Sequence, residues 1–549
     1  METLAVDLET YVRRPLTDDQ LARLRGVGEE VTFEPGAEVI PLGSPMDAFY
    51  YVLEGELEAV DALTGGRYGG STLGPGQFAG EIAFLNGGPA QLGTRAVVAT
   101  RVLRVPRPAM LDLMAKIPEM SDIIITVFAG RRRKLLESDR AGLTLIGADV
   151  DRNLARVAAF AARSRIPFRE VPLGHEVGVA LQQKLALPTD RSAVVFGDHC
   201  HVADPTPRKV ARLAGMDLCI GKLGEVFDVI VVGGGPAGVA AGVYAGSEGL
   251  RALVVDEHTI GGQAGTSARI ENYMGFPTGI SGADLCYRGE IQALKFGTRF
   301  AVPRRVSIVE RQADGTFCVV LDGEERLCAR SIVVATGVQY RRLPIPGLDA
   351  FESAGVYYAA TETEARYCRD ADVVVVGGGN SAGQAAMTLC AGAGHVHLVV
   401  RSDDLAHSMS DYLRSRLVYD DRVSIHYQTE LAGVYGTDRL EGVRLYCKAE
   451  QRHEDRPAVG VFVMVGAAPN TGWLTGLVDL DEQGFVRTGA EVGATSSLAT
   501  SCPGVFAVGD VRAGSVKRVA SAVGEGSVVI SAVWQHLQAA ASGREADAS

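Results

Sequence analysis

Two glycine-rich turns, each directly after an apolar run, constrain this chain more than any other feature. The first reads FDVIVVGGGPAG at 227–238, and the second reads DVVVVGGGNSAG at 372–383. In each, a buried strand is predicted to pass through the glycines into a helix. Glycines at such a place permit a tight turn, close approach of backbone N–H groups to a phosphate, and close packing of helix on strand. The sequence therefore predicts two α/β domains that each bind a dinucleotide.

Four residues of the first unit carry the expected binding chemistry. The Gly-x-Gly-x-x-Gly spacing is formed by Gly233, Gly235 and Gly238, and the second predicted strand ends at Asp256. The first N–H groups of a helix have no partner within the helix, so they bind phosphate, and a carboxylate at the strand end accepts ribose hydroxyls. We predict a dinucleotide with its pyrophosphate at this helix start.

The second unit repeats this pattern with Gly377, Gly379 and Ala382. At the end of its second predicted strand, Arg401 stands where an NAD site usually has an acid, so it could pair with a 2′-phosphate and favour NADPH over NADH. Asp403 follows closely and opposes an anion, which leaves open that Arg401 is a solvated surface charge. Two such units suggest FAD at one and NADPH or NADH at the other.

Four further motifs make the C-terminal part similar to one known family. They are GGQAGTSARIENYMGFPTGISG (261–282), ATG (335–337), GAAPNT (466–471) and VFAVGDVRAGSVKRVASAVGEG (505–526). From about residue 226 to 540 the chain resembles the low-molecular-weight thioredoxin reductases, which are FAD/NAD(P)H flavoproteins. The resemblance implies a homodimer, and it implies that the residues lining the FAD are Gly262, Gln263, Asn272, Asp510, Arg518, Val519 and Ala520.

The same resemblance implies how these domains are arranged. In this family the nicotinamide domain is inserted within the FAD domain, Asp510 holds the ribityl chain, and Arg518 to Ala520 start a helix that faces the flavin pyrimidine edge. The expected FAD-binding domain is therefore formed by 226–345 and 469–540, and the expected NAD(P)H-binding domain by 346–468. A helix N-terminus at that edge is favourable because the reduced flavin carries negative charge there.

The stretch GVYYAATETEARYC at 355–368 departs from this family. Members that reduce disulfides carry a Tyr-Cys-Ala-Thr-Cys-Asp type sequence directly before the nicotinamide-domain strand, and YAATET at 358–363 occupies that place here. Ala359 and Glu362 replace the two cysteines, and dithiol exchange needs a thiolate. We therefore expect electrons to leave this chain without a disulfide of its own at this place.

The first 140 residues have another pattern. Short alternating segments broken by glycines, such as FYYVLEGELEAV, predict a β-roll with helices, which resembles cyclic-nucleotide-binding domains. In GQFAGEIAFLNGGPAQLGTRA at 76–96, Gly80 and Glu81 match the backbone donor and the ribose-binding acid. Ala90 stands where such domains place the phosphate-binding arginine, and Arg95 is expected to start a strand instead. Loss of the phosphate-binding arginine disfavours the binding of a cyclic nucleotide. It favours a roll that serves in dimerisation or docking.

Residues 141–222 alternate strand, helix, strand, helix, strand, strand and helix, which is the order of thioredoxin or glutaredoxin folds. The corner that would hold a Cys-x-x-Cys pair reads GADVDRN at 147–153, without cysteine. We predict a redox-silent module for packing or partner recognition.

Composition excludes several classes of function. The chain has 549 residues and a net charge of −12, and its basic block RRRK at 131–134 is too short for a nucleic-acid footprint. Its start is acidic, it has no long apolar run, and its nine cysteines show no Cys-x-x-Cys spacing. We expect a soluble cytoplasmic protein without bound metal, nucleic acid or membrane.

The sequence leaves three functions open. The leading one is an FAD-dependent oxidoreductase that takes hydride from NAD(P)H and passes electrons to a redox protein, a small oxidant such as a quinone, or O2. A second is a flavin oxidase of a small molecule or peptide with a vestigial nicotinamide site. The third is a flavin-bearing regulatory or scaffold protein that acts through its N-terminal modules.

Overall fold

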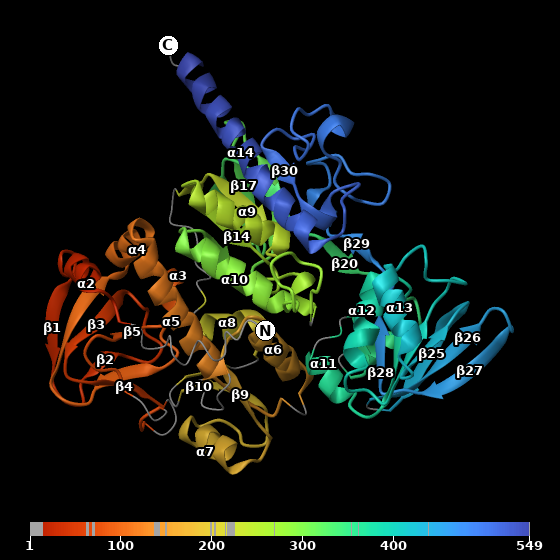
Figure 1. The fold of residues 1–549 in the computed structure, drawn as a ribbon, viewed down its shortest axis with the longest axis horizontal. Helices are drawn as coiled ribbons and strands as arrows, with labels where there is room; N and C mark the ends of the chain where they lie inside the picture. The colour runs from red at the N-terminus through yellow and green to blue at the C-terminus, as the bar shows by residue number, and fades with distance from the viewer. Residues whose placement is uncertain are drawn as a thin grey trace.

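The chain folds into four parts, which follow one another along the sequence except that the fourth is inserted in the third (Figure 1). The computed structural model describes residues 15–547 except 62–64, 69–71, 137–142, 149–150, 198–199, 203–204, 215, 217–224, 268, 353, 359, 361 and 438. No helix in this described part is long and apolar enough to span a membrane.

The first part is the predicted β-roll. Its strands form one sheet in the order β1-β7-β3-β5 and a second in the order β2-β6-β4, around a hydrophobic core that includes four phenylalanines, Phe49, Phe78, Phe84 and Phe128. The strands are β1 (Glu29–Phe33), β2 (Glu38–Ile40), β3 (Ala48–Glu54), β4 (Leu57–Val60), β5 (Phe78–Ala79), β6 (Gly93–Ala96) and β7 (Thr100–Pro106). The helices are α2 (Asp18–Arg25), α3 (Ala83–Asn86), α4 (Arg107–Lys116) and α5 (Pro118–Leu136). Thr17 and Gln20 form a capping box that fixes the start of α2.

The second part, here called the small module, has its seven elements in the predicted order. Its sheet runs β11-β10-β8-β9, with β8 parallel to β9 and antiparallel to β10. The elements are β8 (Leu143–Ile146), α6 (Arg152–Arg163), β9 (Phe168–Val171), α7 (Glu176–Lys184), β10 (Ala193–Phe196), β11 (Cys200–Val202) and α8 (Pro207–Leu213). The predicted redox-silent role remains a prediction.

The third part, the first α/β domain, is built on a parallel sheet in the order β15-β14-β13-β19-β30. A second sheet, β12-β18-β17-β16, packs against it. Its elements are β12 (Val226–Phe227), β13 (Val229–Val232), α9 (Pro236–Ser247), β14 (Ala252–Val255), η1 (Ala264–Thr266), α10 (Gly282–Lys295), β15 (Arg299–Ala301), β16 (Val306–Arg311), β17 (Phe317–Leu321), β18 (Glu325–Ala329), β19 (Ile332–Val334), β20 (Val338–Tyr340), β29 (Ala467–Pro469), η3 (Gly472–Leu474), η4 (Gly489–Val492), β30 (Val505–Ala507), η5 (Gly509–Val511) and α14 (Val519–Asp547).

The fourth part, the inserted domain, has a parallel sheet in the order β21-β28-β22-β23-β24 and an antiparallel sheet β25-β26-β27. Its elements are η2 (Leu348–Phe351), β21 (Val356–Tyr357), α11 (Glu362–Tyr367), β22 (Asp372–Val376), α12 (Asn380–Leu389), β23 (His395–Val399), α13 (Asp411–Tyr419), β24 (Val423–His426), β25 (Thr429–Gly436), β26 (Leu440–Cys447), β27 (Arg452–Pro457) and β28 (Gly460–Val463).

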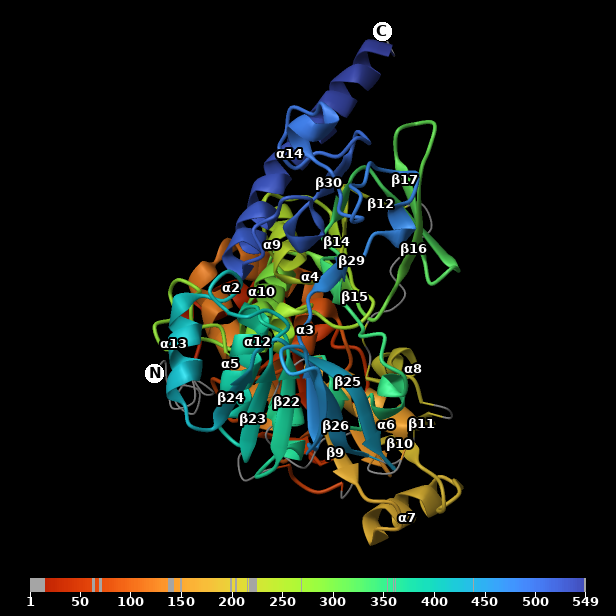
Figure 2. The ribbon, with the colours of Figure 1, turned by 90° about the vertical axis from the view of Figure 1, so that its right-hand side faces the viewer.

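The two chain crossings between these α/β domains lie side by side. Strand β20 leaves the first α/β domain and β29 returns to it, and they pair antiparallel with Val338 opposite Pro469. This pairing joins the two domains at one place, as expected for an insertion. Helix α14 packs along α9 and then projects from the body of the molecule (Figure 2).

The first predicted strand, 227–232, is interrupted in the structure. Val226 and Phe227 pair with β18 in the second sheet, whereas Val229 to Val232 pair with β14 and β19. The carboxylate of Asp228, between them, accepts a hydrogen bond from the backbone N–H of Arg251 and pairs with Arg330. A polar residue at the switch between two sheets therefore ends one strand and starts the next.

Candidate functional site

The first glycine turn brings helix α9 close to the sheet. Gly233 has φ +110°, and a Cβ there would lie 2.3 Å from the carbonyl oxygen of Ala335. A Cβ at Gly238 would lie 1.8 Å from the carbonyl oxygen of Gly233. Both positions therefore require glycine, because any side chain would push α9 away from the end of β13.

At the N-terminus of α9, the backbones of two glycines face each other. Gly235 precedes the first residue of α9, and a Cβ on Gly262 would come within 3.0 Å of its Cα atom. Two glycines that face each other at a helix start leave room for a group that the backbone N–H groups can bind. The residues present thus fit the pyrophosphate of a dinucleotide.

Asp256 shapes the same turn from the end of β14. Its Oδ2 accepts the Gly234 N–H at 2.7 Å, and its Oδ1 accepts the N–H groups of His258 and Thr259 at 2.8 and 3.1 Å. Burial raises the pKa of Asp256, although these hydrogen bonds lower it. Because a carboxylate offers about four acceptor positions, ribose hydroxyls can share it.

A helix begins at the place where a flavin-facing helix start is predicted. Helix α14 begins at Val519, directly after Arg518 and with Ala520 in its first turn. Gly526 lies against α9, where a Cβ would meet the carbonyl oxygen of Ala237 at 2.2 Å. The close crossing of α14 and α9 brings the beginnings of both helices to the same edge of the parallel sheet.

Asp510 is held beside these two helix starts. It lies in η5, whose Gly509 N–H donates to Glu525 of α14 at 2.7 Å, and Arg512 pairs with the same carboxylate at 2.6 Å. Burial raises the pKa of Asp510, and Lys517 lowers it. The Arg512–Glu525 pair, which sequence reasoning did not single out, fixes η5 against α14.

Gln263 and Asn272 extend this site toward the inserted domain. The Gln263 side chain donates to the carbonyl oxygen of Val338 in the crossing strand β20. Asn272 is exposed in the loop 271–277, and Glu271 at the start of that loop pairs with Arg416 of α13 at 2.9 Å. The loop therefore contacts both α/β domains.

The second glycine turn has the same construction. Gly377 has φ +147°, a Cβ there would lie 2.3 Å from the carbonyl oxygen of Met464, and Ala382 is fully buried. Gly379 precedes the first residue of α12. The following loop folds back on this turn, since the Ser408 hydroxyl donates to the Gly378 carbonyl oxygen at 2.7 Å. This helix start also fits a dinucleotide phosphate.

Arg401 follows β23 at the edge where α12 begins. Its side chain is exposed and has no hydrogen bond or ion pair with the described residues. The Asp404 carboxylate accepts the Ala406 N–H at 2.8 Å and so caps its own loop. Of the two nearby acids, Asp403 and Asp404, Asp404 is thus engaged within its own loop. The Arg401 guanidinium is available to bind an anion.

The two glycine turns, each at the start of a helix, agree with the similarity of this chain to known proteins. Residues 227–526 match the family model described as pyridine nucleotide-disulphide oxidoreductase, which spans more than half of the chain. The thioredoxin reductase of Mycolicibacterium smegmatis is 35% identical over 302 residues, covering 55% of this chain and 93% of that protein. The chain belongs to the pyridine nucleotide-disulphide oxidoreductase family.

Other members of this family show the same extent of similarity. The NADPH-dependent thioredoxin reductase 3 of Arabidopsis thaliana is 33% identical over 324 residues, covering 57% of this chain and 59% of that protein. The crystal structure of Lactococcus lactis thioredoxin reductase in the FR conformation superposes with a TM-score of 0.53 and 26% identity, covering 56% of this chain and 98% of that chain. The N-terminal residues 30–117 match the cyclic nucleotide-binding domain. The predicted combination of a thioredoxin reductase-like part with such a domain is confirmed.

The stretch at 355–368 contributes no described thiol pair to this family member. Ala359 lies outside the described residues, and Glu362 is the first residue of α11. Cys368 is fully buried, and burial raises its pKa to about 11. All seven cysteines whose side chains are described are free. The assignment of Ala359 and Glu362 to the lost cysteine positions stays a prediction.

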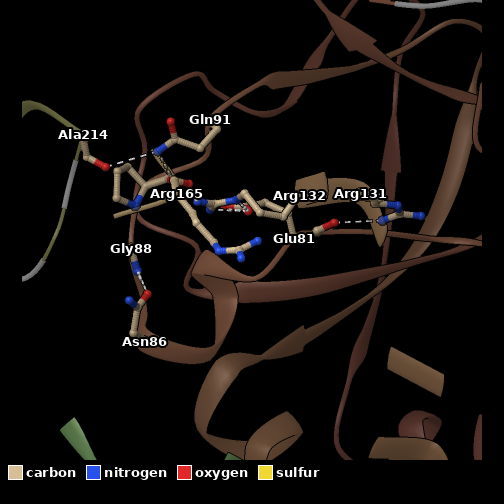
Figure 3. Close-up of polar contacts among 10 residues, drawn as sticks. Glu81, Asn86, Gly88, Gln91, Arg131, Arg132, Arg165 and Ala214 are labelled. Carbon is tan, nitrogen blue, oxygen red and sulfur yellow. Dashed lines mark hydrogen bonds and ion pairs between the residues drawn. The ribbon is translucent and has the colours of Figure 1, made fainter. Parts of the chain in front are cut away.

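The roll's candidate ligand residues are engaged within the chain (Figure 3). The Arg132 guanidinium of α5 binds the Glu81 carboxylate, with Nε 2.8 Å from Oε2, and Arg131 donates to the Gly80 carbonyl oxygen at 2.8 Å. Arg95 lies in β6, as predicted, and binds Glu58 at 2.6 Å. Sequence reasoning missed the roles of Arg131 and Arg132, because RRRK showed only as a short basic block.

Proposed function

We propose that this chain is an FAD-dependent oxidoreductase that takes hydride from NADPH or NADH and passes the electrons to an acceptor other than its own disulfide. One observation supports this most: the chain keeps two glycine cradles at helix starts, while its sequence has no Cys-x-x-Cys pair. FAD would supply the electron-transfer chemistry, so the protein's residues bind, orient and tune charge.

In the first α/β domain, backbone groups would hold the FAD. The free N–H groups at the start of α9 would bind the pyrophosphate, and Asp256 would accept hydroxyls of the adenosine ribose. Asp510, held beside α9 and α14, would accept hydroxyls of the ribityl chain. The start of α14 at Val519 would place partial positive charge at the flavin pyrimidine edge, which stabilises the reduced form.

In the inserted domain, the start of α12 would bind the pyrophosphate of the nicotinamide nucleotide. Arg401 would bind a 2′-phosphate, because it is exposed and without a partner among the described residues. A charge-assisted hydrogen bond of this kind favours NADPH over NADH. We therefore propose NADPH as the preferred hydride donor.

The final electron acceptor would take electrons from the flavin directly, or a diffusing redox protein would carry the electrons to it. The relatives are named thioredoxin reductases. By our assignment, Ala359 and Glu362 occupy the places where such a reductase would have its sulfurs. Without a thiolate there, no dithiol relay can operate at this place. A small oxidant, O2 or a small redox protein then remains as the class of acceptor.

Anaerobic reduction tests this proposal. The purified holoprotein is mixed with NADPH, and separately with NADH, while the flavin absorbance is followed. We expect rapid bleaching with NADPH and slower bleaching with NADH, then reoxidation on adding a quinone or O2. If neither NADPH nor NADH bleaches the flavin, the proposal is wrong. Bleaching by a small organic substrate instead would favour the flavin oxidase.

A further inference from the structure

The acid of the roll that would bind a ribose already has a partner from the chain itself. The Glu81 Oε2 accepts two hydrogen bonds from Arg132, from Nε at 2.8 Å and from a terminal nitrogen. The exposed fractions of the two side chains are only 14% and 10%. A two-point contact between guanidinium and carboxylate is a strong charge-assisted interaction, so a ribose at Oε2 would have to displace it. The other oxygen, Oε1, is buried and has no hydrogen-bond partner among the described residues.

Helix α5 also fills the space above the same turn. Gly80 has φ +139°, and a Cβ there would lie 2.7 Å from the Phe128 ring. Phe128 is fully buried and packs edge-on against Phe78 and Phe84, with ring centroids 6.0 and 5.9 Å apart. A ligand on this turn would meet a packed aromatic core in place of an open pocket.

Among the described residues, the arginines at this turn already have partners within the chain. Ala90 is buried, and its N–H donates to the Ser44 carbonyl oxygen at 2.9 Å. Arg95 is bound to Glu58, and Arg131 donates to the Gly80 carbonyl oxygen. The cations near this turn are therefore engaged in internal contacts.

Arg132 reaches beyond the roll to Arg165 of the small module, which in turn contacts α10. One of its terminal nitrogens donates to the Arg165 carbonyl oxygen at 3.1 Å. The Arg165 guanidinium in turn lies over the Tyr287 ring, 4.4 Å from its centroid, and pairs with Asp284. Burial raises the pKa of Tyr287 to about 12, so its hydroxyl stays neutral. The contact of Glu81 with Arg132 thus lies at a junction of three parts of the molecule.

Helix α10 carries this junction to the predicted flavin turn. Its Ile291 and Leu294 belong to the hydrophobic core of the roll. Its first residue, Gly282, donates to the Ser267 carbonyl oxygen at 2.9 Å, and a Cβ there would lie 1.6 Å from the Ala264 carbonyl oxygen. One helix therefore packs on the roll at one end and on the turn 261–267 at the other.

We propose that the roll binds an internal ligand, the Arg132 guanidinium, in place of a diffusible cyclic nucleotide, and that this contact holds α10 beside the flavin turn. The roll then acts as a fixed clamp on the first α/β domain. Contact along a packed helix provides the physical path between Glu81 and the turn.

Calorimetry tests the first half of this proposal. Cyclic AMP and cyclic GMP are titrated into the full-length holoprotein. We expect no heat of binding up to about 1 mM, since a ligand would lack a free cation and would compete with Arg132. Micromolar binding of either nucleotide by the unaltered protein would overturn the proposal.

Hydrogen exchange tests the second half and does not depend on flavin binding. We expect Arg132→Ala to speed amide exchange within α10 roughly tenfold, because loss of the buried pair releases the helix. Lys134→Ala, an exposed change on the same helix, is the control and should leave the exchange in α10 as it is. The reversed pair, Glu81→Arg with Arg132→Glu, should slow the exchange again.

The outcomes separate this proposal from the function proposed above. Unchanged exchange in α10 with Arg132→Ala, or no recovery with the reversed pair, would contradict the clamp even if NADPH reduces the flavin. Conversely, if NADPH does not reduce the flavin but amide exchange in α10 changes as expected, the clamp proposal stands and the oxidoreductase proposal fails. Exchange in β22 and β23, in the inserted domain, should remain constant and reports on global unfolding.

Discussion

Arg401 decides the expected preference between the two nicotinamide nucleotides. Its guanidinium is exposed at the end of β23 and has no partner among the described residues, so it can pair with a 2′-phosphate. We predict that Arg401→Ala raises the KM for NADPH about 10- to 100-fold, the loss of one charge-assisted bond. The KM for NADH should change less than about twofold, because NADH has no phosphate there.

A matched control uses another exposed arginine of the inserted domain. Arg452 of β27 pairs with Glu450 on the surface, and Arg452→Ala should leave both KM values unchanged. Equal increases for NADPH and NADH with Arg401→Ala would show that Arg401 does not read the 2′-phosphate.

Glu290 of α10 should make stability depend on pH. Burial raises its pKa to about 7, although Arg132 and Arg165 lower it, and Cys286 and Tyr287 lie beside it. A carboxyl whose folded-state pKa is raised contributes stability below its ordinary pKa of 4.5, and this is lost as the pH rises to about 7.

Glu290→Gln should remove this dependence. We predict that the Tm of the variant, relative to the unaltered protein, rises by a few degrees between pH 5 and pH 8, equivalent to about 1–3 kcal/mol. Thermal unfolding at both pH values checks this. A Tm difference that is the same at pH 5 and pH 8 would mean that Glu290 titrates normally.

At the scale of elements, the crossing of α9 and α14 positions the flavin site. A Cβ on Gly526 would lie 2.2 Å from the Ala237 carbonyl oxygen, whereas a Cβ on Gly524, two residues earlier, would meet nothing within 4 Å. We predict that Gly526→Ala lowers stability by about 1–3 kcal/mol through overpacking and weakens FAD retention. Gly524→Ala should be neutral or stabilising by up to about 1 kcal/mol.

The Gly526→Ala and Gly524→Ala variants are compared by the amount of flavin that each holoprotein releases on dilution. Loss of flavin by the Gly526 variant alone supports the close crossing as the determinant of the site. If both variants retain FAD as the unaltered chain does, the helix starts do not need this contact.

Elements whose boundaries are set locally could be predicted from the sequence. The glycine turns and the element order of the small module follow from spacing and apolar runs, whereas the start of α14 at Val519 is implied by the family resemblance. The split at Asp228 could not be predicted, because it depends on Arg251 and Arg330, which are distant in the sequence. For the same reason the pairing of Glu81 with Arg132, 51 residues apart, became visible only in the structure.

At the scale of the whole molecule, the polar contacts that the described residues form between the inserted domain and the first α/β domain include the crossing strands and an exposed ion pair. Strands β20 and β29 form the two crossings, and Arg416 and Glu271 form an exposed ion pair away from them. Exposed pairs of this kind contribute about 0–1 kcal/mol, so they permit rotation of one domain against the other. The roll instead joins the first α/β domain through a hydrophobic core that it shares with α10, and the small module joins it through the ion pair of Arg165 with Asp284.

We propose that electrons pass from NADPH to flavin and onward without a disulfide of the chain. A disulfide takes up two electrons and so does a flavin. Anaerobic titration of the holoprotein with NADPH counts these equivalents against the flavin absorbance. The variant with Ala359→Cys and Glu362→Cys serves as the positive control, since it restores both sulfurs.

We predict that about one NADPH per bound flavin completes the reduction of the unaltered protein, and that about two are needed for the double-cysteine variant. A requirement for two NADPH per flavin in the unaltered protein, with new thiols appearing on alkylation, would show that the chain uses a disulfide of its own.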